Sequence, residues 1–220
     1  MVRRGNSTML NRFSGKIAKS ASAFFSIILI LGFTSSVWSE TNPSWIKLAP
    51  NLDKTLQVNM MRSDFTQISF EIQVPGVWAE EISTKGGIYS SITTPSAGVS
   101  SVVSQPNLPV ITKMVQIPFG ATVSLNVESY EVTEKSLAEM QITHPLVPVQ
   151  TPIPKITGAE QQVPFAIDRT YYQQNAFLPE ELVKLGEIGI IRGHRFANIL
   201  IYPVSYNPQL GRVKIYSNIK

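Results

Sequence analysis

The stretch that decides the fold class is Gln67-Ile68-Ser69-Phe70-Glu71-Ile72-Gln73-Val74. Apolar and polar side chains alternate along it, which is the period of a β-strand with one buried face and one solvated face. Pro75-Gly76 follows directly and is typical of a strand end. The stretch therefore predicts a half-buried β-strand.

Similar patterns recur in the rest of the chain. Runs rich in β-branched residues predict strands over residues 88–93, 110–117, 122–132, 188–192, 196–202 and 212–219. The turn Asn207-Pro208-Gln209-Leu210-Gly211 precedes the last run, and we expect 196–202 and 212–219 to pair as a C-terminal β-hairpin. Residues 196–202 are nearly all apolar, so they are expected to be buried on both faces. The fold class predicted is all-β.

Two segments depart from the strand pattern. Residues 143–164, here named the proline strap, contain Pro145, Pro148, Pro152, Pro154 and Pro164. Proline lacks the N–H that a sheet ladder needs, so the proline strap is expected to be extended, either as a flexible linker or as an ordered arm on the domain. A short helix is predicted within 176–185, where Pro and acidic residues form a helix start and Gly186 a stop.

The first 39 residues have the pattern of a signal peptide. A basic leader without acidic residues precedes a 13-residue apolar run, Ala21–Phe33. A bilayer span needs about 20 apolar residues, so the run fits a signal peptide better than a permanent anchor. Small residues at Val37 and Ser39 place cleavage between Ser39 and Glu40. An uncleaved membrane anchor is the alternative interpretation.

Charge and cysteine content exclude several classes of function. The net charge is +4, but five of the 19 basic residues lie in the leader and all 15 acidic residues follow it. The rest of the chain has 14 basic and 15 acidic residues, a net charge of −1, with no basic cluster for nucleic acid. The chain contains no cysteine, which excludes a thiol nucleophile or a cysteine-ligated zinc within it.

No catalytic, cofactor or metal site is predicted. His194 and Asp168 could be paired with a serine as a hydrolase triad, but no Gly-x-Ser-x-Gly elbow supports this. The acidic residues are too scattered for a metal site. Four aromatic residues could line a sugar-binding or peptide-binding face, although core packing is the favoured interpretation: Trp78, Tyr171, Tyr172 and Phe177.

The C-terminal third resembles a known family. Arg192-Gly193-His194-Arg195, an apolar strand, then Pro203-Val204-Ser205-Tyr206-Asn207-Pro208 and Gly211-Arg212-Val213-Lys214-Ile215-Tyr216 are similar to the end of the gingipain-type propeptide domain. This domain is the N-terminal prosegment of secreted cysteine peptidases. Pieces such as Leu108-Pro109-Val110 and Ile117-Pro118-Phe119-Gly120-Ala121 agree in order, and the resemblance covers Val58–Ile219. Ser104-Gln105-Pro106 departs from it, since the family tends to have glycine before this proline.

The resemblance implies an antiparallel β-sandwich over residues 58–220, preceded by an extension over 40–57. It further implies a docking partner, the catalytic domain of a gingipain-like peptidase, in cis or in trans, which the prosegment keeps latent and helps to fold. The catalytic domain is absent from these residues, so the chain is expected to be a detached or truncated prosegment from a Gram-negative bacterium.

A substrate-like side chain on an exposed loop would occlude the peptidase, and Lys135 and Lys155 are the candidates in or near the proline strap. Under the alternative interpretation both are ordinary surface lysines. The alternative function is an extracellular adhesion or carbohydrate-binding module without a peptidase partner.

Overall fold

The computed structural model describes residues 43–48, 53–157, 159 and 163–220. Residues 40–220 form one compact unit. The predicted leader over 1–39, with cleavage between Ser39 and Glu40, lies outside the described residues. In the described part of the chain, none of the helices is long and apolar enough to cross a membrane.

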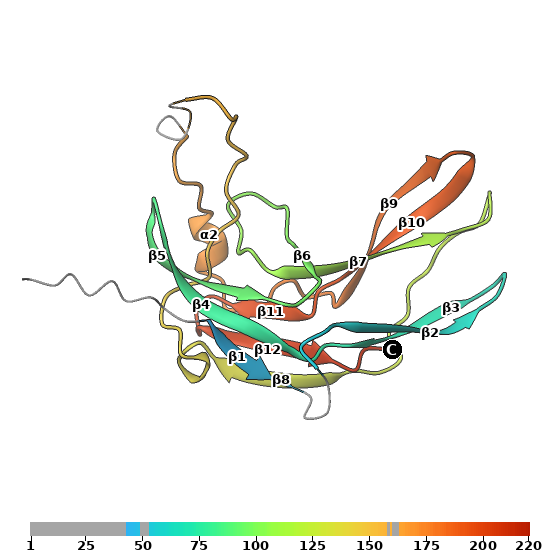
Figure 1. Ribbon diagram of the computed structural model, residues 1–220, viewed down its shortest axis with the longest axis horizontal. Helices are drawn as coiled ribbons and strands as arrows, with labels where there is room; N and C mark the ends of the chain where they lie inside the picture. The colour runs from blue at the N-terminus through green and yellow to red at the C-terminus, as the bar shows by residue number, and fades with distance from the viewer. Residues whose placement is uncertain (1–42, 49–52, 158, 160–162) are drawn as a thin grey trace, which may run out of the picture. The chain divides into compact units, whose positions relative to one another are not determined.

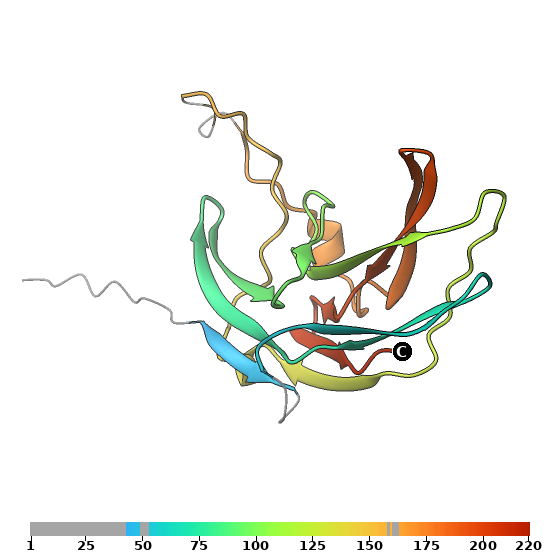
Figure 2. The same cartoon turned by 45° about the vertical axis from the view of Figure 1, so that its right-hand side comes forward.

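Two three-stranded antiparallel sheets pack face to face around the larger core. One sheet has the order β1 (Ser44–Lys47), β4 (Gly76–Thr84), β5 (Gly87–Thr93), and the other has the order β11 (Val204–Asn207), β12 (Arg212–Ser217), β8 (Glu131–Ser136). Figures 1 and 2 show these layers. One apolar cluster draws buried side chains from both sheets, among them Val77, Ile92, Tyr206 and Ile215. The predicted antiparallel β-sandwich is therefore confirmed.

A second core lies where a hairpin meets a four-stranded sheet. The hairpin is β2 (Gln57–Ser63) with β3 (Ile68–Gln73), and the sheet has the order β6 (Gly98–Val99), β7 (Pro109–Gln116), β10 (His194–Ile201), β9 (Val183–Ile191). The strand predicted from residues 67–74 is thus β3, and Ile72 and Val74 are buried in this core. Ile219 exchanges two backbone hydrogen bonds with Ile72, at 2.8 and 2.9 Å, which joins the end of the chain to β3.

The predicted C-terminal hairpin exists, but its first strand is β11. The turn of residues 207–211 connects β11 to β12, with Asn207 opposite Arg212. Residues 194–201 instead pair with β7 and β9 in the other sheet. Pro203, which has no N–H to give to a ladder, separates the two strands. Within β10 only Ala197 and Ile201 are buried, so the prediction of a strand buried on both faces is wrong.

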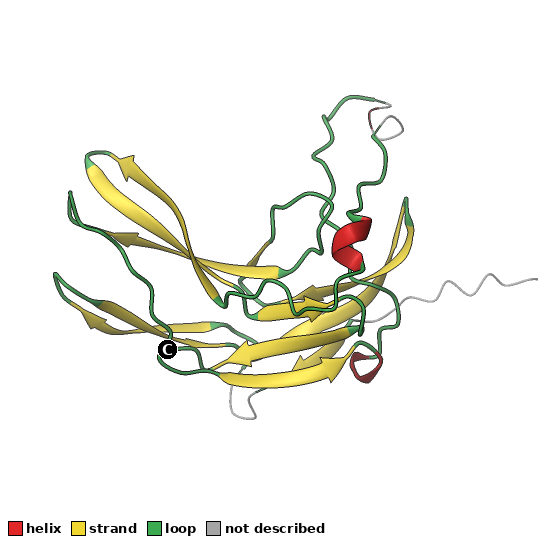
Figure 3. Cartoon of the chain, turned by 180° about the vertical axis from the view of Figure 1, so that it is seen from behind, coloured by secondary structure: helices red, strands yellow, loops and turns green. Residues whose placement is uncertain are grey.

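Two further predictions differ from the structure. Residues 176–185 are not a helix, because Val183, Lys184 and Leu185 pair with β10 at the start of β9. The described helical segments lie elsewhere, at η1 (Ala138–Met140) and α2 (Arg169–Tyr172) (Figure 3). The sequence predicts a strand over residues 122–132. Residues 122–128 do alternate between exposed and half-buried positions, but the strand in this region, β8, spans Glu131–Ser136.

The sheet also uses residues from the expected N-terminal extension. Strand β1 lies within the 40–57 segment and pairs with β4, placing Trp45 opposite Trp78. The two indole rings lie 4.9 Å apart, with Lys54 over the Trp78 ring at 4.3 Å. Gly76 allows β1 to lie this close to β4, because a Cβ at position 76 would lie 2.4 Å from the carbonyl oxygen of Ile46. Residues before Val58 therefore contribute a strand to the domain.

Candidate functional site

The first half of the proline strap is an ordered arm within the body of the domain. Ser90 donates from its N–H to the carbonyl of Pro145 at 2.9 Å and accepts from the N–H of Val147 at 2.8 Å. On its other side, Val147 accepts from Asn107, and Val149 donates to Gln105, each at 2.8 Å. The ladder uses the N–H groups of the residues between prolines, so Pro145 and Pro148 remove no bond from it.

The second half of the proline strap leaves the body as an exposed loop. We name residues 151–157, with the returning residues 163–164, the Lys155 loop. All of residues 151–157 are exposed, and Figures 1 and 2 show the segment extending beyond β5 and α2. The sequence places no other Lys or Arg between Lys135 and Arg169. Lys155 is therefore an isolated cation on a projecting segment.

Lys155 lies at the apex of a tight turn. The N–H of Ile156 donates to the carbonyl of Pro154 at 2.8 Å, which closes a three-residue turn centred on Lys155. Two apolar side chains flank it, with Ile153 at 41% and Ile156 at 69% exposure. Pro152 and Pro154 fix φ on the approach, which lowers the conformational freedom of the loop. A basic side chain between exposed apolar ones suits insertion into a partner's cleft.

The returning leg of the loop is packed against strand β5. The ring of Phe165 stacks on Tyr89, with centroids 5.3 Å apart and planes at 30°. Lys85 donates from Nζ to the carbonyl of Val163 at 2.8 Å. Asp168 then caps α2, accepting from the N–H groups of Thr170 and Tyr171 at 3.0 Å each.

A polar cluster holds the start of the proline strap against β4. The Glu81 carboxylate accepts from the Thr143 N–H and hydroxyl at 2.8 Å each and lies 2.9 Å from His144 Nδ1. The hydrogen bond with His144 and those from Thr143 lower the pKa of Glu81 to about 2.

Two tyrosines of helix α2 have raised pKa values. Burial is the main cause that raises the pKa of Tyr171 to about 12, and burial also raises the pKa of Tyr172.

Lys135, the second predicted loop lysine, is not on a loop. It lies within β8 opposite Val213 and is half-buried. Ladder pairing with β12 fixes its backbone, so Lys135 lacks the projection that an occluding residue needs. Lys155 thus lies on a loop and Lys135 in strand β8, while the occluding role of either lysine stays a prediction.

The residues of the predicted family-motif turn lie in or next to the hairpin of β11 and β12. Tyr206 is 1% exposed in the larger core and exchanges backbone hydrogen bonds with Leu178 at 2.9 and 3.0 Å. The Asn207 side chain accepts from the Leu210 N–H at 3.1 Å, and Gly211 takes φ of 58°. Pro203 accepts from Tyr216, and Pro208 lies inside the turn. These residues build the hairpin.

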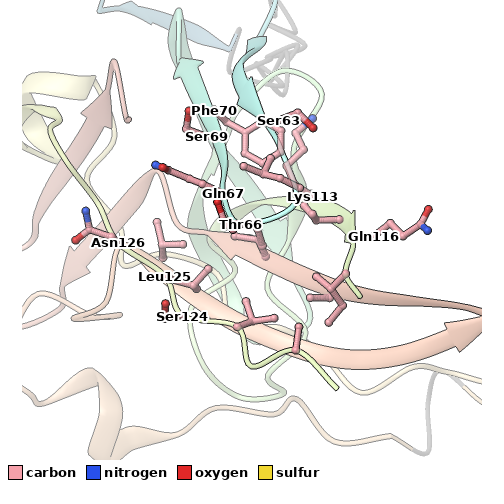
Figure 4. Close-up of a pocket in the computed structure, with 18 of the residues that line it drawn as sticks. Ser63, Thr66, Gln67, Ser69, Phe70, Lys113, Gln116, Ser124, Leu125 and Asn126 are labelled. Carbon is pink, nitrogen blue, oxygen red and sulfur yellow. The ribbon is translucent and has the colours of Figure 1, made fainter. Parts of the chain in front are cut away.

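A groove lies where the β2–β3 hairpin faces strands β7 and β10 of the four-stranded sheet. It has a volume of about 900 Å³ and is lined by the β2–β3 turn, β7, β10 and residues 121–128. Figure 4 shows polar side chains such as Gln67, Gln116 and Asn126 around it, with Leu125 and Phe70. Arg195 donates to the carbonyls of Pro118 and Ala121, at 3.1 and 2.7 Å, and so fixes one wall.

The histidine and aromatic candidates are dispersed. His194 is exposed, with Nδ1 3.1 Å from Gln116 Nε2, whereas Asp168 caps α2. The structure thus gives the two members of the hypothetical triad to different sites. Trp78 packs on Trp45, and Phe177 lies 4.2 Å below Lys214 Nζ. Within the described ranges, no group of three His, Asp or Glu side chains could hold a metal ion.

Sequence reasoning missed the packing that supports the loop. Phe165 and Tyr89 are 76 positions apart in the sequence, and neither belongs to a motif. The one available signal is the cluster of prolines on both sides of Lys155, which marks the loop but not its contacts.

Fold and site together define an all-β domain with a projecting loop that carries a basic side chain. The chain belongs to the Propeptide_C25 family, whose model matches residues 47–220. The predicted resemblance to gingipain-type propeptides is therefore confirmed. The matched family is one of propeptides, and the chain has no cysteine that could act as a peptidase nucleophile.

Curated relatives and solved structures agree with this assignment. Two Lys-gingipains of Porphyromonas gingivalis are 29% and 28% identical over 166 residues, 76% of this chain. The chain spans about a tenth of the length of these relatives. A structure on the zymogenic latency of gingipain K from Porphyromonas gingivalis matches with a TM-score of 0.71 and 28% identity, covering 81% of this chain and 95% of that one.

A second solved structure supports the fold alone. It is the complex of pro- and mature domains of Porphyromonas gingivalis RgpB, at 20% identity and a TM-score of 0.63. The match covers 74% of this chain and 82% of that chain.

Proposed function

We propose that this domain keeps a gingipain-like cysteine peptidase latent, in cis or in trans, and assists its folding. Family membership supports the partner, as does the likeness to a domain of gingipain K studied for its zymogenic latency. The relatives are about ten times longer than the matched segment, which leaves room in them for a catalytic domain. The domain itself supplies no thiol nucleophile, since it has no cysteine. It acts by binding.

The Lys155 loop is the observation that carries this proposal. A peptidase cleft is concave, and occluding it requires a segment that projects from the inhibitor. Lys155 lies on such a segment, at the centre of a tight turn between exposed Ile153 and Ile156. The matched relatives are named Lys-gingipains, and a lysine is the side chain that a lysine-directed pocket would take. Lys155 is the proposed occluding residue.

The role in folding rests on the independence of the domain. Residues 40–220 form a compact unit with two buried apolar cores of their own. A prosegment that folds first offers a preformed surface on which the catalytic domain can assemble, and it loses little conformational entropy on docking. Export is proposed to occur through the leader over residues 1–39, with cleavage between Ser39 and Glu40, in a Gram-negative bacterium.

Inhibition by the isolated domain tests the proposal. The protein comprising residues 40–220 is titrated against a mature gingipain-like peptidase, and hydrolysis of a lysyl substrate is followed. We expect saturable inhibition with a Kd in the nanomolar to micromolar range, about 8–12 kcal/mol of binding. A folded domain that leaves the peptidase fully active would overturn the proposal and favour an adhesion or carbohydrate-binding module.

A further inference from the structure

The two legs of the Lys155 loop are joined by one side chain. The Gln150 Oε1 atom accepts from the N–H of Ala166 at 2.9 Å, and its Nε2 atom donates to the carbonyl of Ala166, also at 2.9 Å. Nε2 also donates to the carbonyl of Pro148 at 3.0 Å. The amide of Gln150 therefore bonds both backbone groups of a residue 16 positions away, as a neighbouring strand would.

The proline content of the loop explains why a side chain, and not the backbone, joins the two legs. Pro152 and Pro154 have no N–H, so the departing leg has few donors with which to pair the returning leg. A primary amide carries both an acceptor oxygen and two donors, and it can replace a backbone peptide in this geometry. Gln150 and Ala166 are both half-buried, which shields the paired amides from competing water.

Each leg is tied separately to the body of the domain. The departing leg is held at Val149, which bonds Gln105 and Ser104 through its backbone at 2.8 Å each. The returning leg is held by the stacking of Phe165 on Tyr89. Gln150 is the cross-tie between the two legs, placed at the point where the loop leaves the body and five positions before Lys155.

We infer that Gln150 is the positioning residue of the inhibitory loop: its amide fixes the base of the loop and thereby the direction in which Lys155 is presented to the peptidase. This inference rests on the proposed function. A loop whose ends are fixed loses less conformational freedom when it enters a cleft, so it binds more tightly with the same contacts. Gln150 itself makes no contact with the peptidase in this account.

A double-mutant cycle tests the inference, with residues 40–220 as inhibitor of a mature gingipain-like peptidase. Gln150→Ala is expected to raise the inhibition constant about tenfold, from the loss of three hydrogen bonds and a freer loop. Gln150→Glu keeps the acceptor for the Ala166 N–H but places a carboxylate oxygen against the carbonyls of Ala166 and Pro148, so a rise at least as large is expected. Gln209→Ala, at an exposed turn position, is the matched control and should inhibit like the wild type.

The cycle separates positioning from general stability. In a Lys155→Ala background, the further change Gln150→Ala should alter the inhibition constant less than about twofold, because no lysine remains to be positioned. Amide hydrogen exchange at Ala166 gives a readout independent of the peptidase: it should be about tenfold faster in Gln150→Ala, with distant core amides unchanged.

Each outcome decides one question. If Gln150→Ala inhibits like the wild type although exchange at Ala166 is faster, the positioning role is wrong and the proposed function stands. If Gln150→Ala weakens inhibition equally with Lys155 present and with Lys155→Ala, the positioning role is also wrong, because the effect would then be one of stability. If the wild-type domain fails to inhibit, the proposed function falls and takes the positioning role with it, whereas the exchange data still report whether the tie exists.

Discussion

The ring of Phe165 lies directly on Gly86. A Cβ atom at position 86 would be 2.5 Å from two carbons of this ring, closer than side chains can approach. Gly86 sits in the turn between β4 and β5, so the hairpin turn is shaped to receive a ring from the returning leg of the Lys155 loop. The glycine is therefore part of the support of the loop.

Gly86→Ala should displace the Phe165 ring and weaken its stack on Tyr89. We expect the free energy of unfolding to fall by about 1 kcal/mol, since overpacking at a partly exposed site can be relieved by a shift of the ring. Urea denaturation measures the loss, and the proton chemical shifts of the Tyr89 ring report the stack. Gly189→Ala is the control: no atom lies within 4 Å of its added Cβ, so stability should be unchanged or slightly raised. Equal effects of both changes would contradict the account.

The larger core depends on strand β12 of the hairpin. Ile215 is fully buried between the two three-stranded sheets. Ile215→Ala should lower the free energy of unfolding by about 2–5 kcal/mol, through lost burial and a residual cavity. Leu210→Ala, at 54% exposure in the adjacent turn, should change it by less than about 0.5 kcal/mol. Urea unfolding of both variants checks this, and a small loss for Ile215→Ala would show that the sheets do not pack as described.

Much of the fold could be predicted from alternation alone. The strand at 67–74, the strand at 110–117 and the final strand all appear, because each has one buried and one wet face that a period of two reveals. Pairing was less predictable. The hairpin turn at Asn207 and Gly211 was correct, but its first strand starts at Val204, since Pro203 separates two strands that join different sheets.

The wrong predictions have a common physical cause, which is that pairing with strands distant in the sequence decided the local structure. The residues at Val183–Leu185 have no strong local preference, and β10 recruits them into a ladder. Residues 122–130 alternate like a strand, but only Glu131–Ser136 has the β12 edge beside it. For the site, proline spacing indicated an extended segment and marked Lys155. The contacts of Gln150 and Phe165 join distant parts of the chain, and neither residue type nor spacing encodes them.

The carboxylate of Glu81 gives a prediction about pH. Its pKa of about 2 lies below the ordinary value of 4.5 because His144 and Thr143 hydrogen-bond the ionised form. A depressed pKa means that this group stabilises the fold above about pH 4.5 and loses that contribution as the pH falls toward 2. Carbon-13 NMR titration of the Glu81 carboxyl should show a midpoint near 2.

The hydrogen-bond partners of Glu81 supply the control. Thr143→Val removes the hydroxyl donor and should move the midpoint upward, toward 4.5. A wild-type midpoint near 4.5 would show that the cluster at the start of the proline strap is absent in solution.

Export provides a test of the leader. Expression of the full chain in a Gram-negative host should yield a protein whose N-terminus is Glu40, as measured by mass spectrometry of the exported fraction. Replacing Leu29 in the apolar run by Arg should abolish both export and cleavage, because a charge interrupts the run that the export machinery recognises. Retention of the uncleaved wild-type chain in the membrane fraction would favour the anchor interpretation.

The most direct test of latency by the Lys155 loop is the inhibition constant of Lys155→Ala. The account predicts that this change weakens inhibition of a mature gingipain-like peptidase by about 30-fold or more, the usual effect of removing a central binding residue. The control is Lys135→Ala, which changes a lysine whose backbone is paired in β8. It should leave the inhibition constant within about twofold of the wild type. Inhibition by Lys155→Ala at the wild-type level would contradict the central claim.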